Sequence, residues 1–113
     1  MWKRCWLYLI FIGRNDRQGA PIPDQLFDEA RDGVEQLILS SLGGLTKVRV
    51  VEGWGSTATW AEEQSTLLAT ITDNQQADQV LERCGTTLAH SLVQDQVWIA
   101  KQQTDLFISS LHD

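Results

Sequence analysis

The sequence predicts a single α+β domain that spans residues 1–113, and three features of the chain lead to this prediction. Its 113 residues suffice for one domain with a modest core. Apolar residues make up 42% of the chain, a proportion typical of a globular protein rather than a disordered one. Segments with helical spacing of apolar residues are interspersed with β-branched and aromatic segments, in the order strand, helix, strand, strand, helix, strand.

The first element is an unbroken apolar run, "CWLYLIFI", at residues 5–12, which ends at Gly13. Two positive charges, Lys3 and Arg4, precede the run, as they do in an export signal. The next segment, "GRNDRQGAP", offers no small-residue cleavage site, however, and the run is too short to span a bilayer. We therefore expect a strand that is buried on both of its faces.

The first helix follows the loop "GRNDRQGAPIP" and begins near Pro23 or Asp24. Proline suits a first helical turn, and an acidic residue suits the positive end of the helix dipole. Gly43-Gly44 is a typical C-terminal stop. Between these limits the apolar positions follow helical spacing: Phe27, Ala30, Val34, Leu37, Ile38 and Leu42.

The second and third strands are predicted at "KVRVVEG" (47–53) and "STLLATIT" (65–72), with "WGSTATWAEEQ" (54–64) as the hairpin loop between them. Asp73 or Asn74 is expected to cap the second helix. The apolar stripe of that helix is Ala77, Leu81, Cys84, Leu88 and Leu92. The fourth strand is "QVWIAK" (96–101), and "TDLFISSL" (104–111) is expected to add an edge strand or a helical turn. This order is that of the ferredoxin-like α+β fold, in which two helices cover one face of a four-stranded antiparallel sheet.

Both faces of the first strand are apolar, because successive side chains point to opposite faces. In a lone domain of this fold, the face away from the helices meets water and should be polar. We expect the following residues to face the helices: Val48, Val50, Leu67, Ala69, Ile71, Val97 and Ile99. We expect the opposite face to consist of Trp6, Tyr8, Ile10, Arg49, Val51, Leu68, Thr70 and Trp98.

An apolar face of this size is typical of a binding surface, and the commonest partner is a second copy of the same chain. The sequence therefore predicts a homodimer in which two sheets meet, as in a dimeric α/β barrel. Two forms of this dimer stay open: a solid core, in which Arg49 forms a salt bridge or extends to the rim, and a pocket between the sheets. The candidate ligand-binding residues of the pocket are Tyr8, Arg49, Thr70, Trp98, Trp6, Trp54 and Trp60. Trp54 and Trp60 would close over the face from the hairpin loop, or else pack within that loop.

The remaining reactive side chains predict neither a metal site nor a catalytic residue. His90 is expected on the exposed side of the second helix, and His112 lies near the end of the chain; no Cys/His spacing suits a metal. Glu62 and Glu63 would act as acid and base only if their loop folded over the pocket, and a solvated loop is the alternative. We expect no cofactor.

The charge and the cysteine content limit the compartment and the partners. A net charge of −6 and a pI of about 4.7 argue against nucleic acid and against an anionic membrane surface as partners. Cys5 and Cys84 are expected to be free buried thiols, because small secreted scaffolds carry more cysteines. We therefore expect a soluble cytoplasmic protein.

Four stretches carry a resemblance to a known family: "YLIFIG", "GGLTKVRVVEGWG", "EEQSTLLATI" and "QDQVWIA". Their order resembles that of a bacterial family of domains of unknown function with a ferredoxin-like fold. The first strand and the hairpin loop depart from the family pattern. The resemblance implies the fold and a bacterial origin, and it implies no activity.

Two functions follow from these observations. The first is a homodimeric binding module that uses the sheet face opposite the helices for dimerisation and for a small, partly apolar or anionic ligand. The alternative is a cofactor-free enzyme of the dimeric α/β-barrel kind, similar to a monooxygenase or an isomerase. Binding is favoured over catalysis, because Arg49 and Tyr8 are the only good candidates for a pocket group with a shifted pKa, and neither is an obvious base.

Overall fold

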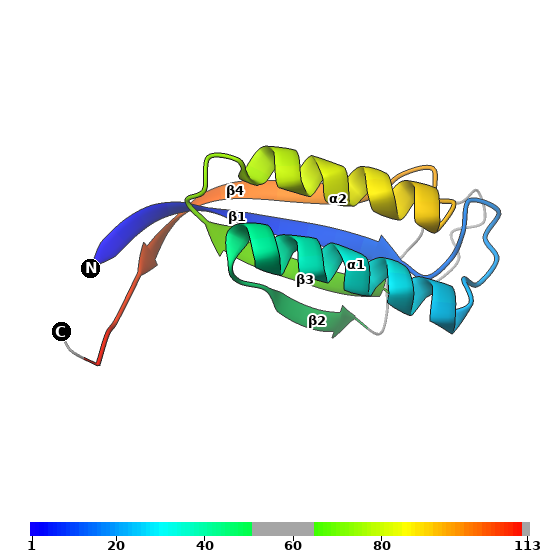
Figure 1. Ribbon diagram of the computed structural model, residues 1–113, viewed down its shortest axis with the longest axis horizontal. Coiled ribbons are helices and arrows are strands. Elements are labelled where there is room, and N and C mark those ends of the chain that lie inside the picture. The colour runs from blue at the N-terminus through cyan, green and yellow to red at the C-terminus, as the bar shows by residue number, and fades with distance from the viewer. Residues whose placement is uncertain (51–64, 112–113) are drawn as a thin grey trace.

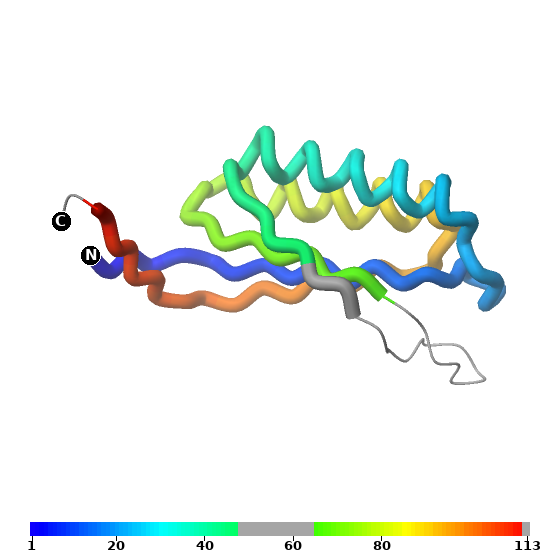
Figure 2. Tube along the Cα trace, turned by 90° about the horizontal axis from the view of Figure 1, so that it is seen from below, coloured from blue at the N-terminus to red at the C-terminus, as the bar shows by residue number. Residues whose placement is uncertain are grey.

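A computed structural model confirms the ferredoxin-like α+β fold (Figure 1). The structure describes residues 1–50 and 65–111, without the side chains of residues 48–50. Within this part the elements are β1 (Trp2–Gly13), α1 (Asp24–Leu42), β2 (Thr46–Val50), β3 (Ser65–Thr72), α2 (Ala77–Ser91) and β4 (Trp98–Phe107). The strands form an antiparallel sheet in the order β2-β3-β1-β4, and both helices lie on one side of it (Figure 2).

Strands β1 and β4 reach beyond the rest of the sheet. β1 pairs with β4 from Trp2, opposite Phe107, to Phe11, opposite Trp98. Its pairing with β3 begins only at Trp6. Residues 2–5 and 104–107 therefore form a two-stranded ribbon, here called the arm, that projects past the helices (Figure 1). The molecule measures 51 × 23 × 22 Å as a result.

The predicted limits of these two strands were too narrow. β1 begins three residues before the predicted run, and β4 continues through the segment 104–107 that was expected to form a separate edge strand or a helical turn. The extra residues of β1 and most of those of β4 are polar or aromatic, and residues 2–4 pair with residues 105–107. A pattern of apolar residues does not show such a segment, because no core lies against it.

The core lies between the sheet and the two helices. Its largest fully buried side chains are Phe27, Ile10, Ile12, Ile38, Leu68, Leu81, Leu88, Leu92, Val34 and Cys84. The two helices contribute the stripes that were predicted for them, and both cysteines are free and buried, as predicted. His90 is exposed on α2, also as predicted.

The predicted faces of β1 and β3 were wrong. Tyr8, Ile10 and Leu68 were expected to face away from the helices, yet they are buried beneath them with 3%, 1% and 1% of their surface exposed. Thr70 is buried on the same side, and Trp6 packs partly buried against this core. Both residue sets on β1 are apolar, so alternation alone did not show which set the helices cover.

For β4, by contrast, the prediction was correct. Ile99 packs against the core. A Cβ added to Gly85 of α2 would lie 3.0 Å from the Cδ1 atom of Ile99. The glycine thus allows α2 to lie close to β4, which explains a residue that otherwise only weakens a helix. Trp98 points to the other side and is 63% exposed.

The ends of α1 follow the predicted signals. The helix begins at Asp24, directly after Pro23, and ends at Gly43, which adopts a left-handed conformation with φ of 84°. The Gly43 N–H donates to the Leu39 carbonyl at 3.0 Å. Among the described helices, neither has the length and apolar character needed to cross a bilayer.

Candidate functional site

One face of the sheet carries no helix and is apolar. Here we call it the open face, and its apolar members on β1, β3 and β4 are Leu7, Leu9, Phe11, Leu67, Ala69, Ile71, Trp98 and Ala100; the uncharged Gln102, opposite Leu7, lies on the same face. The strand register places them together, because residues directly opposite one another in an antiparallel pair share a face. Phe11, for example, lies between Leu67 and Trp98.

The open face is accessible to a partner. Trp98, Ile71 and Phe11 are 63%, 44% and 43% exposed, and Leu7 and Leu9 are half-buried. None of its members carries a charge. Contiguous exposed apolar surface of this kind is typical of an interaction site rather than of a solvated surface.

A polar group lies on the other side of the sheet, where α2 begins above β1 and β4. We call it the Tyr8 cluster, and its members are Trp6, Tyr8, Asp78 and Lys101. The Tyr8 hydroxyl donates to Oδ1 of Asp78 at 2.5 Å, and the Lys101 ammonium lies 2.9 Å from the same oxygen. The ammonium also lies 4.2 Å from the centre of the Trp6 ring. Aromatic faces and a carboxylate thus surround one cation.

The ionisation states of this cluster follow from its contacts. Burial raises the pKa of the Tyr8 hydroxyl well above its ordinary value, and the hydrogen bond to Asp78 raises that pKa further. The hydrogen bond from Tyr8, followed by the one from Lys101, lowers the pKa of Asp78 below its ordinary value. At neutral pH, Asp78 is therefore ionised and Tyr8 is protonated. Tyr8 is a hydrogen-bond donor here and is not suited to act as a general base.

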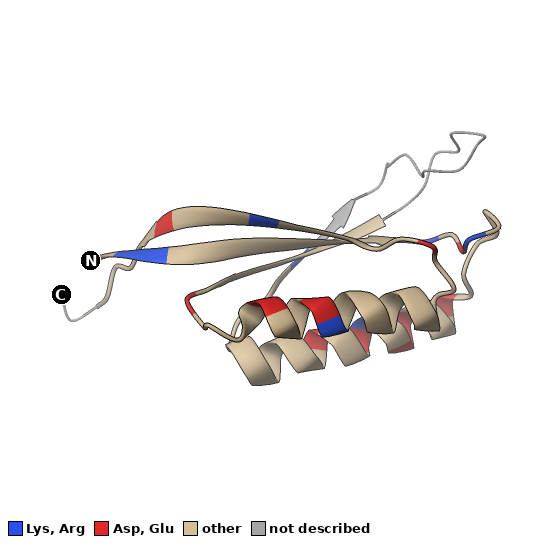
Figure 3. Cartoon of the chain, turned by 90° about the horizontal axis from the view of Figure 1, so that it is seen from above, with Lys and Arg blue, Asp and Glu red and all other residues tan. Residues whose placement is uncertain are grey.

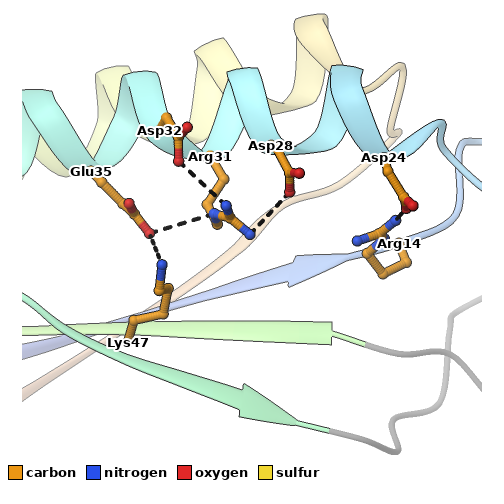
Figure 4. A network of polar contacts seen from close by, with 7 residues as sticks. All are labelled: Arg14, Asp24, Asp28, Arg31, Asp32, Glu35 and Lys47. Carbon is orange, nitrogen blue, oxygen red and sulfur yellow. Dashed lines mark hydrogen bonds and ion pairs between the residues drawn. The ribbon is translucent and has the colours of Figure 1, made fainter.

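A second polar network surrounds Arg31 on α1 (Figure 4). The Arg31 guanidinium lies 3.2 Å from Asp28, 3.3 Å from Asp32 and 3.6 Å from Glu35, and Lys47 of β2 lies 3.3 Å from the same Glu35 oxygen. Each charge has opposite charges beside it, so the network links α1 to β2. We assign it a structural role.

The structure separates the predicted ligand-binding residues. Trp98 lies on the open face, whereas Trp6, Tyr8 and Thr70 lie on the helix side. The Thr70 hydroxyl donates to the Gly44 carbonyl at 2.6 Å and so ties β3 to the turn after α1. The predicted site is therefore divided between two surfaces.

The three other predicted residues are Arg49, Trp54 and Trp60. Arg49 lies in β2, opposite Thr66 in the strand register. Trp54 and Trp60, like Val51, Glu62, Glu63 and His112, lie outside the described residues. Whether any of the predicted residues binds a ligand stays a prediction.

Sequence reasoning missed Asp78 and Lys101. Lys101 was placed in the fourth strand without a role, and Asp78 was read only as part of a helix. The available signal was the strand register, since Lys101 lies directly opposite Tyr8. Asp78 stands in the first turn of α2, where an acidic residue is favourable. Elsewhere, residues 1–50 and 65–111 bring no three His, Cys, Asp or Glu side chains together in a group suited to a metal ion.

Comparison with known proteins shows likeness in fold only. Neither a protein-family model nor a curated protein matches the sequence. Among solved structures, the chain is similar to a phage SAM lyase in complex with S-methyl-5'-thioadenosine, with a TM-score of 0.64 and 14% identity over 92% of this chain and 90% of that one. It is also similar to a phage SAM lyase in the apo state, with a TM-score of 0.61 and 17% identity over 94% and 90% of the two chains. At these identities the likeness extends to the fold and no further.

Proposed function

We propose that this protein self-associates through its open face, binds SAM-type nucleosides and cleaves SAM. The observation that carries the proposal is the end-to-end likeness to a SAM lyase solved with S-methyl-5'-thioadenosine, which covers 92% of this chain and 90% of that one. The cytoplasmic location and bacterial origin expected from the sequence are part of the proposal.

The chemistry of the ligand suits the Tyr8 cluster. SAM (S-adenosylmethionine) carries a positive sulfonium, whereas S-methyl-5'-thioadenosine is a neutral thioether. The Asp78 carboxylate and the Trp6 ring already hold one cation, the Lys101 ammonium. We assign this place to the sulfonium, with Lys101 moving aside or turning to the carboxylate of the ligand.

Cleavage by a lyase needs no co-reactant. When the bond between the sulfonium sulfur and the aminobutyrate carbon breaks, the bonding electrons go to sulfur and S-methyl-5'-thioadenosine leaves. The four-carbon product then forms either by attack of the substrate's own carboxylate on that carbon, which closes a lactone, or by loss of a neighbouring proton to solvent water, which leaves an alkene. The proposed role of Asp78 is to hold the sulfonium, and we assign no base.

Self-association is proposed for the open face because a second copy suits its chemistry. A chain of net charge −6 repels its own copies at most surfaces, but the members of this face carry no charge. A two-fold contact would bring apolar residues of three strands against the same residues of the partner. The proposed assembly is the homodimer that the sequence predicts.

The first test is incubation of the purified protein with SAM, followed by chromatography and mass spectrometry. We expect S-methyl-5'-thioadenosine to accumulate faster than in buffer alone, and the accompanying four-carbon product will distinguish carboxylate attack from proton loss. If S-methyl-5'-thioadenosine does not accumulate above the buffer rate, the lyase proposal is wrong.

Calorimetric titration with S-methyl-5'-thioadenosine then tests the binding part of the proposal separately from the cleavage of SAM. The alternative predicted from the sequence, a monooxygenase- or isomerase-like enzyme, stays a prediction.

A pair of variants tests the place of the sulfonium. Asp78→Asn should weaken binding of SAM by about threefold to tenfold while affecting S-methyl-5'-thioadenosine less, because only SAM is a cation. Asp28→Asn, which removes an exposed carboxylate on α1, is the matched control and should change neither affinity. Equal losses for the two ligands in Asp78→Asn would place the sulfonium elsewhere.

A further inference from the structure

Lys101 places a cation in the Tyr8 cluster of the free protein. Its ammonium contacts both oxygens of the Asp78 carboxylate, Oδ1 at 2.9 Å and Oδ2 at 3.0 Å. It also lies 4.2 Å from the centre of the Trp6 ring and 5.8 Å from that of the Tyr8 ring. Aromatic rings and a carboxylate are groups with which proteins bind organic cations. The cluster is therefore a cation site whose occupant belongs to the chain itself.

The groups around this cation are held in place without it. The Tyr8 hydroxyl donates to Oδ1 of Asp78, so the carboxylate keeps a buried anchor when the ammonium leaves. Trp6 packs partly buried against the core. Asp78 also lies in the first turn of α2, at the helix end that favours a negative charge. Departure of Lys101 would thus leave Oδ2 of Asp78 and the Trp6 ring open to another cation.

Lys101 can leave because it lies at the edge of the sheet. β4 is the last strand in the sheet order, and the side chains of Lys101 and Asp78 are 37% and 54% exposed. An ion pair between side chains this exposed is weak. The backbone nevertheless keeps the ammonium close, so it competes with any cation from solution. A ligand that displaces it binds with an apparent affinity that is reduced to the fraction of molecules in which the site is open.

We propose that Lys101 is a built-in competitor that sets the affinity and the selectivity of this site for organic cations. The inference rests on the sulfonium site of the proposed function, and it chooses between the two movements of Lys101 named there. The side chain leaves for solvent, because a sulfonium and an ammonium beside the single Asp78 carboxylate would repel each other. The ligands that fit are sulfonium and quaternary ammonium groups, which carry a positive charge on an apolar surface.

The test uses tetramethylammonium as the probe and Lys101→Met, which keeps an apolar stem and removes the charge. Binding is followed at constant ionic strength by the NMR signal of the Trp6 indole N–H, which is assigned from its absence in Trp6→Phe. We expect Lys101→Met to bind the probe about threefold to tenfold more tightly than the wild type. Lys101→Arg keeps a cation at this place and should bind it no more tightly than the wild type.

A matched control separates this site from the general charge of the chain. Figure 3 shows Asp and Glu spaced along both helices, so loss of any lysine strengthens the overall attraction for cations. Lys47→Met makes the same change in net charge at another lysine of the sheet, which lies 3.3 Å from Glu35 and is 47% exposed. It should leave the affinity for tetramethylammonium unchanged. In Lys101→Met, added Asp78→Asn should abolish the gain.

The same variants are then titrated with SAM, before its cleavage is appreciable, and with S-methyl-5'-thioadenosine. Lys101→Met should bind SAM about threefold to tenfold more tightly and the neutral S-methyl-5'-thioadenosine as the wild type does. Weaker SAM binding would show that Lys101 holds the carboxylate of the ligand, and it would overturn the competitor role.

The outcomes separate this inference from the proposed function. No gain for tetramethylammonium in Lys101→Met, or an equal gain in Lys47→Met, would overturn the inference even if the protein cleaves SAM. A gain confined to Lys101→Met and lost with Asp78→Asn would support the cation site even if the protein neither binds nor cleaves SAM, in which case the proposed function alone is wrong.

Discussion

The two faces of the sheet are both apolar, yet only one of them is covered. On the helix side, Ile10 and Leu68 are 1% exposed, whereas Phe11 and Ile71 on the open face are 43% and 44% exposed. The covered side also contains more hydroxyl groups, including those of Tyr8 and three buried threonines. Hydroxyls did not mark the exposed side in this protein, because a buried hydroxyl is tolerated when it has a partner.

Thr70 and Thr72 illustrate this point. The Thr70 hydroxyl donates to the Gly44 carbonyl, and the Thr72 hydroxyl accepts a hydrogen bond from the Asn74 N–H at 3.0 Å. Both partners belong to turns that connect the sheet to the helices. Polar atoms at the rim of a covered face can thus tie the layers together. On the open face, the Trp98 indole N–H donates to Oε1 of Gln96, two residues earlier in the chain, at 3.1 Å, and this local contact joins no layers.

The largest expected effect is a loss in the free energy of unfolding, and it differs between the two faces of the sheet. Ile10→Ala should lower the free energy of unfolding by about 2–5 kcal/mol, because it leaves a cavity beneath the helices. Ile71→Ala makes the same chemical change on the open face and should cost the monomer about 1 kcal/mol or less, because the side chain is already half in water. Urea unfolding at a concentration where the protein is monomeric measures both. Similar losses would show that the open face is covered in the monomer.

A smaller effect on stability, but a clear effect on mass, is expected for Trp98→Asp. The new carboxylate would be solvated in the monomer, whereas in an assembly it would be buried against its own copy across a two-fold axis. Light scattering during gel filtration should show a monomer for this variant. Val93→Asp, at a position that is 52% exposed and outside the open face, should keep the wild-type mass. A wild-type mass for Trp98→Asp would argue against the open face as the contact surface.

The order and type of the elements were predictable from the sequence, because each helix has its own apolar stripe. The predicted end signals hold for α1, whereas the predicted cap of α2 at Asp73 or Asn74 was wrong, because α2 begins after Gln76 with no side-chain cap. Pro23 with Asp24 and Gly43 mark α1 at both ends, and these signals depend only on local backbone chemistry. Which alternate residues of β1 face the helices was not predictable in the same way. Ile10 and Leu9 are equally apolar neighbours, and only the position of the helices decides which one is buried.

The candidate site was less predictable for a related reason. Tyr8 and Trp6 were selected as aromatic residues on an apolar strand, but their partners Asp78 and Lys101 come from α2 and β4, 70 and 93 residues after Tyr8 in the chain. Only the sheet register and the position of α2 bring these groups together. The arm was missed because its pairing depends on two strands continuing past the core.

The smallest expected effect concerns the ionisation of Tyr8, and it reports directly on which face this residue occupies. The chain has one tyrosine, so the ultraviolet absorbance of tyrosinate reports on Tyr8 alone. On the open face, a solvated Tyr8 would titrate with a pKa near the ordinary value of 10. Beneath the helices, burial and the Asp78 carboxylate raise that pKa, so the folded protein should show no tyrosinate at pH 10.

The sign of the accompanying change in stability follows from linkage. Tyr8 loses its proton more readily in the unfolded chain than in the folded one, so its contribution to stability is present below about pH 10 and decreases above it. Asp78→Asn should lower the Tyr8 pKa without restoring it to 10, because burial is the larger cause. Asp73→Asn, which breaks the ion pair with Lys3, is the matched control and should leave the Tyr8 titration unchanged. Tyrosinate absorbance with a midpoint near 10 in the folded wild type would place Tyr8 in water and reverse the two faces of β1.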